Sequence, residues 1–508
     1  MADFQELVDL ASEKLGGTVL FANDDFFAEK ENLLRPKKAV FLEHEYTDRG
    51  KWMDGWESRR KRGPGHDFAI VRLGLPGIVR GVVVDTSFFR GNYPDACSIS
   101  WTYAPAETPI DVLLSDATVW RPLLPQSKLA GDSANLFPVN VPDAVTHLRL
   151  DIFPDGGVAR LRVHGDVVPD WRRIGTPGSE FDLAALENGG ESLVVSDMFF
   201  GVRHNLLMPG RAINMSDGWE TKRRRGPGKD WNVVRLVDRG FVQRVEVDTN
   251  HFKGNYPDTF ELEGADLPAD APRGSAFDPE KVTWTRILPR TKLQAHTRHF
   301  FRDAIEDAGP FTHVRLTIHP DGGVSRLRVH GTLAPEARAR QALLSLARMT
   351  PAEAEATFLR TCGSRAWAKA MTAKRPFASP EALFEAAATT WKAASKDDVR
   401  EAFGAHPRIG EKKADRTQGA VAAAWSSAEQ AAASAATEAS KAALADGNRR
   451  YEAKFGHIFL VCATGKTADE MLALLEARLA NDAAKEMDVA AAEQGKITRL
   501  RLERFLLA

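Results

Sequence analysis

Charged side chains lie beside a Gly-Pro-Gly turn in a block that the chain contains twice. The first copy, DGWESRRKRGPG, begins at Asp54, and the second, DGWETKRRRGPG, begins at Asp217, 163 residues later. Glycine allows a ligand to approach the backbone closely. The planar guanidinium of Arg60 or Arg223, or alternatively that of Arg62 or Arg225, is suited to bind a carboxylate through two parallel hydrogen bonds. The alternative is that these arginines are solvated or form ion pairs with acidic neighbours.

A second doubled block places polar side chains at the end of an apolar run. It reads VVVDTSFFRGNYPDA in the first copy and VEVDTNHFKGNYPDT in the second. An apolar strand followed by Asp-Thr, an aromatic residue, Gly and Asn is typical of polar groups delivered to the rim of a pocket. Asp85 and Asn92 hold these positions in the first copy, and Asp248 and Asn255 hold them in the second. Alternatively, these side chains stabilise turns.

One histidine, His406, precedes a proline in the motif REAFGAHPRIGEK. Pro407 disfavours helical backbone at the residue before it, so the imidazole is presented where a helix gives way to a loop. A single histidine is more often structural than catalytic. The motif by itself therefore leaves both roles open.

Short strands and turns must position the doubled blocks. Alternating apolar runs bounded by Gly, Pro, Asn and Asp predict β-structure, and the segment VTHLRLDIFPDGGVARLRVHG, with its later copy, predicts a β-hairpin. Each copy is long enough for its own core, which favours two tandem β-sandwiches. We place the first at residues 1–175 and the second at 176–338.

Helical periodicity replaces the strand pattern near residue 339 and continues to residue 508. The segments TPAEAE, SPEALFEAA and TADEMLALLEARL predict helix starts, because Ser or Thr precedes an acidic first turn. This region is predicted to be an all-α domain, and the Ala-rich stretch within it is predicted to be helical.

Composition limits the classes of function. The chain has 508 residues and a formal net charge of -1, which argues against a dedicated nucleic-acid-binding protein. Its three cysteines are far apart and form no CxxC pair, so a reducing compartment fits best. No apolar run is long enough to span a bilayer. We therefore expect a cytoplasmic protein without membrane partners.

The doubled motifs DGWE-x-x-R-x-RGPG and VDT-x-x-F-x-GNYPD, with WRPLLP and WTRILP, resemble the two repeats of allantoicase. That family cleaves allantoate to ureidoglycolate and urea, and the resemblance implies two jelly-roll-like sandwiches. Family members have been associated with divalent cations. The resemblance identifies no metal ligands in this sequence, so a metal in these repeats stays open.

Allantoate carries a carboxylate and two ureido groups, which Arg, Asn, Asp and Thr side chains are able to bind. Release of urea needs general acid–base assistance. We expect His251 and Glu220 to be catalytic, with Asp248 and Asn255 near them. The first copy has Phe88 in place of His251, so we predict either one functional copy or one site between the copies.

The helical region contains TCGSRAWAKAM, REAFGAHPRIGEK, SSAEQ and NRRYEAKFGHIFLVCATGK, which together resemble OHCU decarboxylase, where OHCU is 2-oxo-4-hydroxy-4-carboxy-5-ureidoimidazoline. That family is all-α, uses no cofactor and forms (S)-allantoin. By this resemblance His406 and Glu429 are catalytic. Lys466 stands where the family often has an arginine. The positions expected to bind substrate are Pro407, Ser426, Gln430, Asn448 and Lys466.

Together, these features predict a bifunctional enzyme of purine catabolism that acts on small molecules and forms a homo-oligomer. The alternative is a pair of ligand-binding sandwiches attached to a helical decarboxylase or interaction domain.

Overall fold

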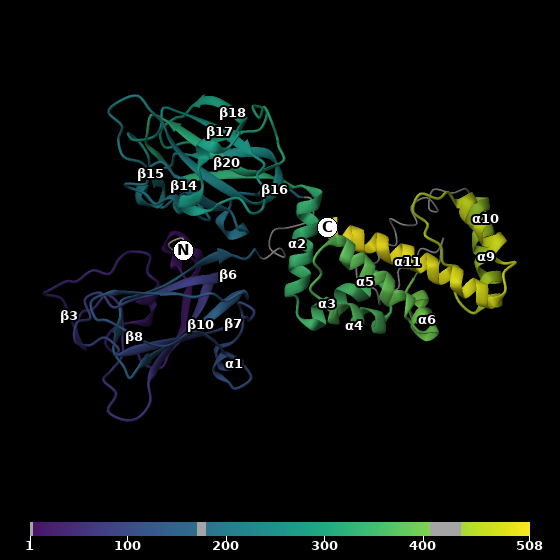
Figure 1. Cartoon of the computed structure of the whole chain (residues 1–508), viewed down its shortest axis with the longest axis horizontal. Coiled ribbons are helices and arrows are strands. Elements are labelled where there is room, and N and C mark those ends of the chain that lie inside the picture. The colour runs from purple at the N-terminus through teal and green to yellow at the C-terminus, as the bar shows by residue number, and fades with distance from the viewer. Residues whose placement is uncertain (1–3, 170–178, 407–437, 508) are drawn as a thin grey trace. The chain divides into compact units, whose positions relative to one another are not determined.

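The computed structural model describes residues 4–169, 179–406 and 438–507. The described residues before Pro335 form one compact unit made of strands, and those from Pro335 onward form a second unit made of helices (Figure 1). The predicted class, two all-β sandwiches followed by an all-α domain, is confirmed. Within the described ranges, no helix is long and apolar enough to cross a membrane.

One long strand, β6 (Asp67–Asp85), organises the first sandwich. Its first half pairs with β10 and β2, and its second half pairs with β12 and β9. Gly74, Pro76 and Gly77 interrupt its apolar alternation near the middle, where the register with β10 also shifts. A single strand thus pairs with one set of strands through its first half and with another set through its second half. The partners in this eight-stranded sheet are β1 (Val8–Asp9), β2 (Thr18–Ala22), β7 (Ala96–Thr102), β8 (Arg121–Lys128), β9 (Ala134–Pro138), β10 (Val145–Phe153) and β12 (Arg160–Val167).

The second sandwich repeats this plan around β16 (Asp230–Asp248). Its strand order, β13-β22-β16-β20-β17-β18, matches β1-β12-β6-β10-β7-β8 of the first. The partners of β16 in this sheet are β13 (Phe181–Asp182), β14 (Glu191–Val195), β17 (Thr259–Ala265), β18 (Thr285–Lys292), β19 (Arg298–Phe301), β20 (Phe311–His319) and β22 (Arg326–Leu333).

A small second sheet in each sandwich carries the tryptophan of the DGWE block. In the first, β5 (Trp56–Glu57) pairs with β11 (Gly157–Val158), and in the second, β15 (Trp219–Glu220) pairs with β21 (Gly323–Val324). Both indoles are fully buried, and each donates its N–H to a backbone carbonyl, 2.8 Å from Asp24 O and 2.9 Å from Asp197 O. Burial of about 200 Å² at about 25 cal/mol per Å² contributes on the order of 5 kcal/mol for each ring. The glutamate that follows is therefore held on an anchored strand.

The predicted β-hairpin across PDGG is wrong. Strands β10 and β12 lie on opposite sides of β6 and do not pair with each other. The PDGG turn instead packs against the DGWE block, where Lys61 N–H donates to Asp155 at 2.7 Å and Arg224 N–H donates to Asp321 at 2.7 Å. Each of the two strands forms its backbone hydrogen bonds with a different half of β6 instead.

The helices of the second unit begin where the sequence predicts. Thr350 and Thr467 form capping boxes with Glu353 and Glu470, and Ser379 accepts a hydrogen bond from the N–H of Ala382. The Ala-rich stretch predicted to be helical lies largely outside the described residues. The described helices of this unit are α2 (Pro335–Arg348), α3 (Pro351–Cys362), α4 (Arg365–Ala373), α5 (Pro380–Lys392), α6 (Lys396–Gly404), α9 (Glu438–Phe455), α10 (Ala468–Arg478) and α11 (Ala483–Leu507), and the first sandwich contains one short helix, α1 (Ile110–Leu114).

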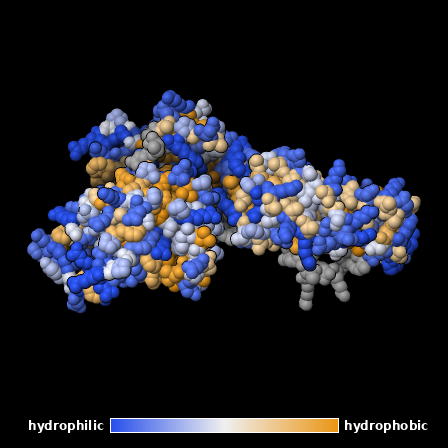
Figure 2. Space-filling view, turned by 60° about the horizontal axis from the view of Figure 1, so that its bottom comes forward, coloured by the Kyte–Doolittle hydropathy of each residue, from blue (hydrophilic) through white to orange (hydrophobic). Residues whose placement is uncertain are grey.

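The core of the helical unit packs α11 against the first helices. Phe358, Trp367 and Leu502 belong to one buried cluster, and the indole N–H of Trp367 donates to Ala387 O at 3.2 Å. On the surface, hydrophilic side chains are interrupted by apolar patches, as Figure 2 shows for one face of the molecule. Each unit thus has buried apolar clusters of its own.

Candidate active sites

A glutamate and an asparagine form a hydrogen-bonded pair in each sandwich. Asn92 donates to Glu57 at 2.7 Å, and Asn255 donates to Glu220 in the equivalent place. The glutamates come from β5 and β15, and the asparagines come from the loops that follow β6 and β16. Burial raises the pKa of both Glu57 and Glu220, while the hydrogen bond from the asparagine side chain partly opposes that rise. Each pair therefore offers a carboxyl group that binds a proton more readily than an ordinary glutamate.

His251 and Phe88 occupy equivalent positions and share an unusual backbone conformation. Their φ angles are 71° and 69°, in the left-handed region that non-glycine residues rarely adopt. Each backbone N–H is bonded: His251 N–H donates to Nδ1 of His296 at 2.8 Å, and Phe88 N–H donates to Oδ1 of Asp132 at 2.7 Å. The same backbone conformation therefore carries an imidazole in the second repeat and a phenyl ring in the first.

The hydrogen bonds of His251 assign its tautomer. Its Nε2 lies 3.0 Å from the carbonyl oxygen of Ala212. Because a carbonyl only accepts, Nε2 carries the hydrogen and Nδ1 of the neutral ring is left as the basic nitrogen. This is the arrangement that a general base requires.

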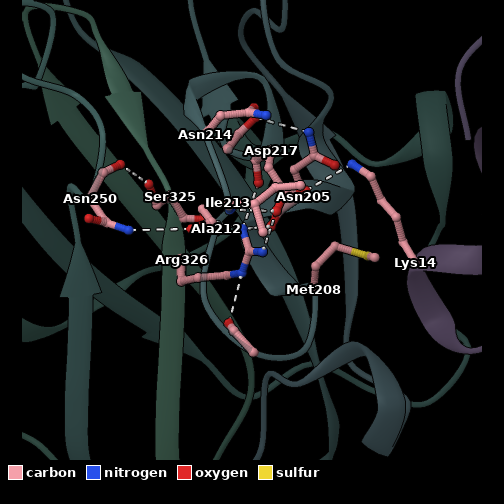
Figure 3. A network of polar contacts seen from close by, with 12 residues as sticks. Lys14, Asn205, Met208, Ala212, Ile213, Asn214, Asp217, Asn250, Ser325 and Arg326 are labelled. Atoms are coloured by element: carbon pink, nitrogen blue, oxygen red, sulfur yellow. Dashed lines mark hydrogen bonds and ion pairs between the residues drawn. The ribbon is translucent and has the colours of Figure 1, made fainter.

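A buried ion-pair network of Arg326 and Asp217 adjoins the segment that contains Ala212 (Figure 3). Arg326 is 3% exposed, and its guanidinium lies 3.1 Å from Asp217 Oδ2 and also donates to the backbone carbonyls of Asn205 and Asp217. Lys14, from the first repeat, lies 2.8 Å from Asp217 Oδ1. Asp217 also accepts the N–H of Ile213, the residue after Ala212, at 3.3 Å. The network thus fixes the segment that orients His251.

The first repeat builds the same network with a different outer cation. Arg160 lies 2.7 Å from Asp54, as Arg326 lies beside Asp217. The second cation beside Asp54 is Arg35, at 3.5 Å, which comes from the same repeat. Of these two networks, as far as the described residues show them, the one at Asp217 includes a residue of the other repeat, Lys14, whereas the one at Asp54 does not.

The remaining substrate-binding predictions in the sandwiches lie in different settings. Arg60 and Arg223 are exposed, whereas neighbouring cations form ion pairs. Asp85 accepts from the backbone N–H of Ser87 at 2.8 Å, and Asp248 accepts from the N–H of Asn250 at 2.8 Å. In this structure both aspartates therefore stabilise turns, which is the alternative role considered from the sequence. Their contact with substrate stays a prediction.

Sequence reasoning gave Glu57 no role in binding or catalysis. Its equivalence to Glu220 at an offset of 163 residues was the available signal. Among the described residues, no group of three or more His, Cys, Asp and Glu side chains is arranged to hold a metal ion.

His406 lies just after α6, at the helix-to-loop junction that the sequence predicts. Its Nε2 is buried and has no hydrogen-bond partner among the described residues. Burial, and then the charge of Arg501 on α11, lowers its pKa to about 3. The imidazole is therefore neutral near physiological pH.

The segment that carries Lys466 is held by hydrogen bonds to charged side chains. Arg478 donates to Leu460 O at 2.7 Å, and Glu493 accepts the N–H of Cys462 at 2.7 Å. Lys466 itself donates to Cys462 O at 2.7 Å. The other predicted binding residue in this part, Asn448, is buried on α9.

Four predicted site residues lie outside the described residues, and their contacts stay predictions. They are Pro407, Ser426, Glu429 and Gln430.

Comparisons with known proteins divide the chain at the same places as its fold. Residues 8–168 and 181–334 match the family model described as allantoicase repeat, and residues 347–503 match the one described as OHCU decarboxylase. A probable allantoicase of Photobacterium profundum is 47% identical over 329 residues, which cover 65% of this chain and 97% of that protein. The crystal structure of allantoicase from Saccharomyces cerevisiae is 35% identical, with a TM-score of 0.54, and the match covers 64% of this chain and 92% of that one. A crystal structure of OHCU decarboxylase in the presence of (S)-allantoin is 34% identical over 30% of this chain and 97% of that one, with a TM-score of 0.26.

Proposed function

This chain belongs to the allantoicase family, and on that premise we propose that its repeats hydrolyse allantoate to ureidoglycolate and urea. Its C-terminal domain decarboxylates OHCU to (S)-allantoin. The chain is thus a bifunctional enzyme of purine catabolism that acts on small molecules. Family membership does not favour the alternative, in which the sandwiches only bind ligands.

The carrying observation is the arrangement of Glu220, His251 and Asn255. In the first repeat, the equivalent side chains Glu57, Phe88 and Asn92 line one cavity, so these three positions are neighbours in the fold. The second repeat presents a carboxyl group with a raised pKa and an imidazole whose Nδ1 is basic. An acid and a base thus occupy adjoining positions.

Allantoate hydrolysis replaces one ureido group by a hydroxyl group taken from water. The leaving nitrogen must gain a proton and the attacking water must lose one. Protonated Glu220 donates to the leaving nitrogen, and Nδ1 of His251 accepts the proton of the water. Asn255 holds the Glu220 carboxyl, and the exposed Arg223 is available to bind the substrate carboxylate. The protons then redistribute through solvent, and urea departs.

Decarboxylation of OHCU breaks a carbon–carbon bond and leaves an electron pair on the ring. The adjacent C=N bond of the imidazoline ring takes up that electron pair, so this chemistry needs no cofactor. Neutral His406, together with Glu429, orients the substrate hydroxyl, and fixed donors stabilise the enolate-like product. Lys466 supplies a positive charge beside it. Protonation of one face then gives a single stereoisomer.

Two further properties follow as proposals. The described cysteines, Cys97, Cys362 and Cys462, are buried free thiols, which suits a cytoplasmic location. The second repeat exposes large apolar side chains, including Phe199, which is 63% exposed. Exposed apolar side chains of this kind support a homo-oligomer.

The two activities are separable by substitution in the full chain. Glu220→Gln keeps the shape of the side chain but removes the acid, so urea release from allantoate falls by about 10² to 10⁴. OHCU decarboxylation in the same variant stays unchanged. Equal loss of both activities, or retention of urea release, would contradict the assignment.

A further inference from the structure

The two repeats differ in length directly before the DGWE block. Seventeen residues separate Pro36 from Asp54 in the first repeat, whereas seven separate Pro209 from Asp217 in the second. The ten additional residues include the short hairpin of β3 (Tyr46–Thr47) and β4 (Gly50–Lys51). The first repeat therefore has a covering segment that the second lacks.

That segment lines one side of an open cavity of about 330 Å³ in the first repeat. Phe27, Phe41 and Phe88 form apolar walls, and Phe41 is stacked on Phe88 with ring centroids 5.7 Å apart and planes 20° from parallel. In the second repeat, Phe200 takes the place of Phe27 and is 61% exposed. The position of Phe27 is thus partly buried in the first repeat and exposed in the second.

The polar groups of the cavity match a small ureido acid. Glu57 and Asn92 supply carboxyl and amide groups that pair with the N–H and C=O groups of a ureide. Lys51 also lines the cavity, with its Nζ 4.6 Å from the centroid of Phe41, and its ammonium suits a carboxylate. The phenyl rings supply an apolar wall beside that ureido acid. At roughly 30 Å³ for each water-sized group, the volume holds on the order of ten non-hydrogen atoms.

The same cavity lacks the imidazole that the second repeat has. Phe88 stands at the position of His251, so no imidazole is present at that position to accept a proton from water. We propose that this cavity is a second binding site, separate from the catalytic centre of the second repeat, that holds a small anionic ureido acid without cleaving it. The proposal rests on the proposed function, because substrate and product of that reaction belong to this chemical class.

Calorimetric titration of the full chain with allantoate tests this site. The Glu220→Gln/His251→Ala variant does not consume the ligand, and it is expected to retain binding at the first repeat. Adding Glu57→Gln, which keeps the side-chain shape, weakens that binding at least tenfold, and adding Lys51→Met weakens it severalfold. Lys38→Met, a matched loss of charge from the same segment, leaves the affinity unchanged.

Two results would overturn the second site. One is binding that Glu57→Gln and Lys51→Met leave unaltered, and the other is loss of urea release in the single Glu57→Gln variant together with turnover by Glu220→Gln/His251→Ala. Thermal unfolding of each variant establishes that it is folded. Failure of the proposed function would be distinct, because the unsubstituted chain would then release no urea from allantoate.

Discussion

Replacing Lys14 by methionine removes the contact through which one repeat reaches the buried network of the other. The ammonium lies 2.8 Å from Asp217, with side-chain exposures of 33% and 9%. A contact of this kind lies between an exposed ion pair and a buried charged hydrogen bond, so its loss costs about 1.5 kcal/mol. At about 2.1 cal/mol/K of unfolding entropy per residue, this loss lowers the melting temperature of a unit of about 330 residues by about 2 °C.

Arg35→Met provides the matched control in the first repeat. Arg35 lies 3.5 Å from Asp54 and is 48% exposed, so its loss costs at most about 0.5 kcal/mol. Burial alone would raise the pKa of Asp217, but Lys14 and then Arg326 hold it below its ordinary value. The Lys14→Met deficit is therefore full above the unfolded pKa of about 3.9, and it disappears as the pH falls through the folded value.

Differential scanning calorimetry of the full chain, with the sandwich transition followed separately from the helical one, measures this difference. Because Asp217 also holds Ile213 beside the carbonyl that orients His251, the kcat for allantoate should fall severalfold in Lys14→Met. Equal shifts for Lys14→Met and Arg35→Met would refute the reasoning.

Three further predictions concern the helical unit. His406→Asn should slow the decay of freshly generated OHCU by about 10² or more while urea release continues, and an unchanged decay rate would argue against catalysis by His406. Since burial lowers the pKa of His406 to about 3, this histidine should give the decarboxylation rate no acid limb between about pH 5 and 8; an acid limb near pH 6.5 that His406→Asn removes would contradict that. Glu486 is fully buried and accepts from Arg478 at 2.7 Å, so Glu486→Gln should destabilise the helical unit by about 3 to 5 kcal/mol, and an unshifted helical transition in calorimetry would count against the pair.

Local signals predicted the elements well, whereas strand pairing needed information from distant residues. Thr350, Ser379 and Thr467 are cap residues whose partners lie within three positions, so the sequence alone identifies the helix starts. Strands β10 and β12 are separated by a tight turn, yet both pair with β6. Alternation of apolar residues predicts a strand but does not determine its neighbour.

The candidate sites divide in the same way. The doubling of the blocks identified the residue types at the rim, and comparison of the copies pointed to His251 against Phe88. It did not predict that Lys14 would bond Asp217 across 203 positions, because such a contact depends on how the two repeats pack. The roles of Asp85 and Asp248 in turns follow from backbone geometry that residue types alone leave open.

Chemical rescue of a His251→Gly variant tests the central claim most directly. The full chain carrying this substitution should show a kcat for urea release from allantoate lower by about 10² or more. Added imidazole should restore part of that rate, because it enters the space left by the side chain and accepts the proton of the attacking water. Undiminished urea release by His251→Gly, or a loss that imidazole does not reverse in folded protein, would contradict catalysis by His251 in the second repeat.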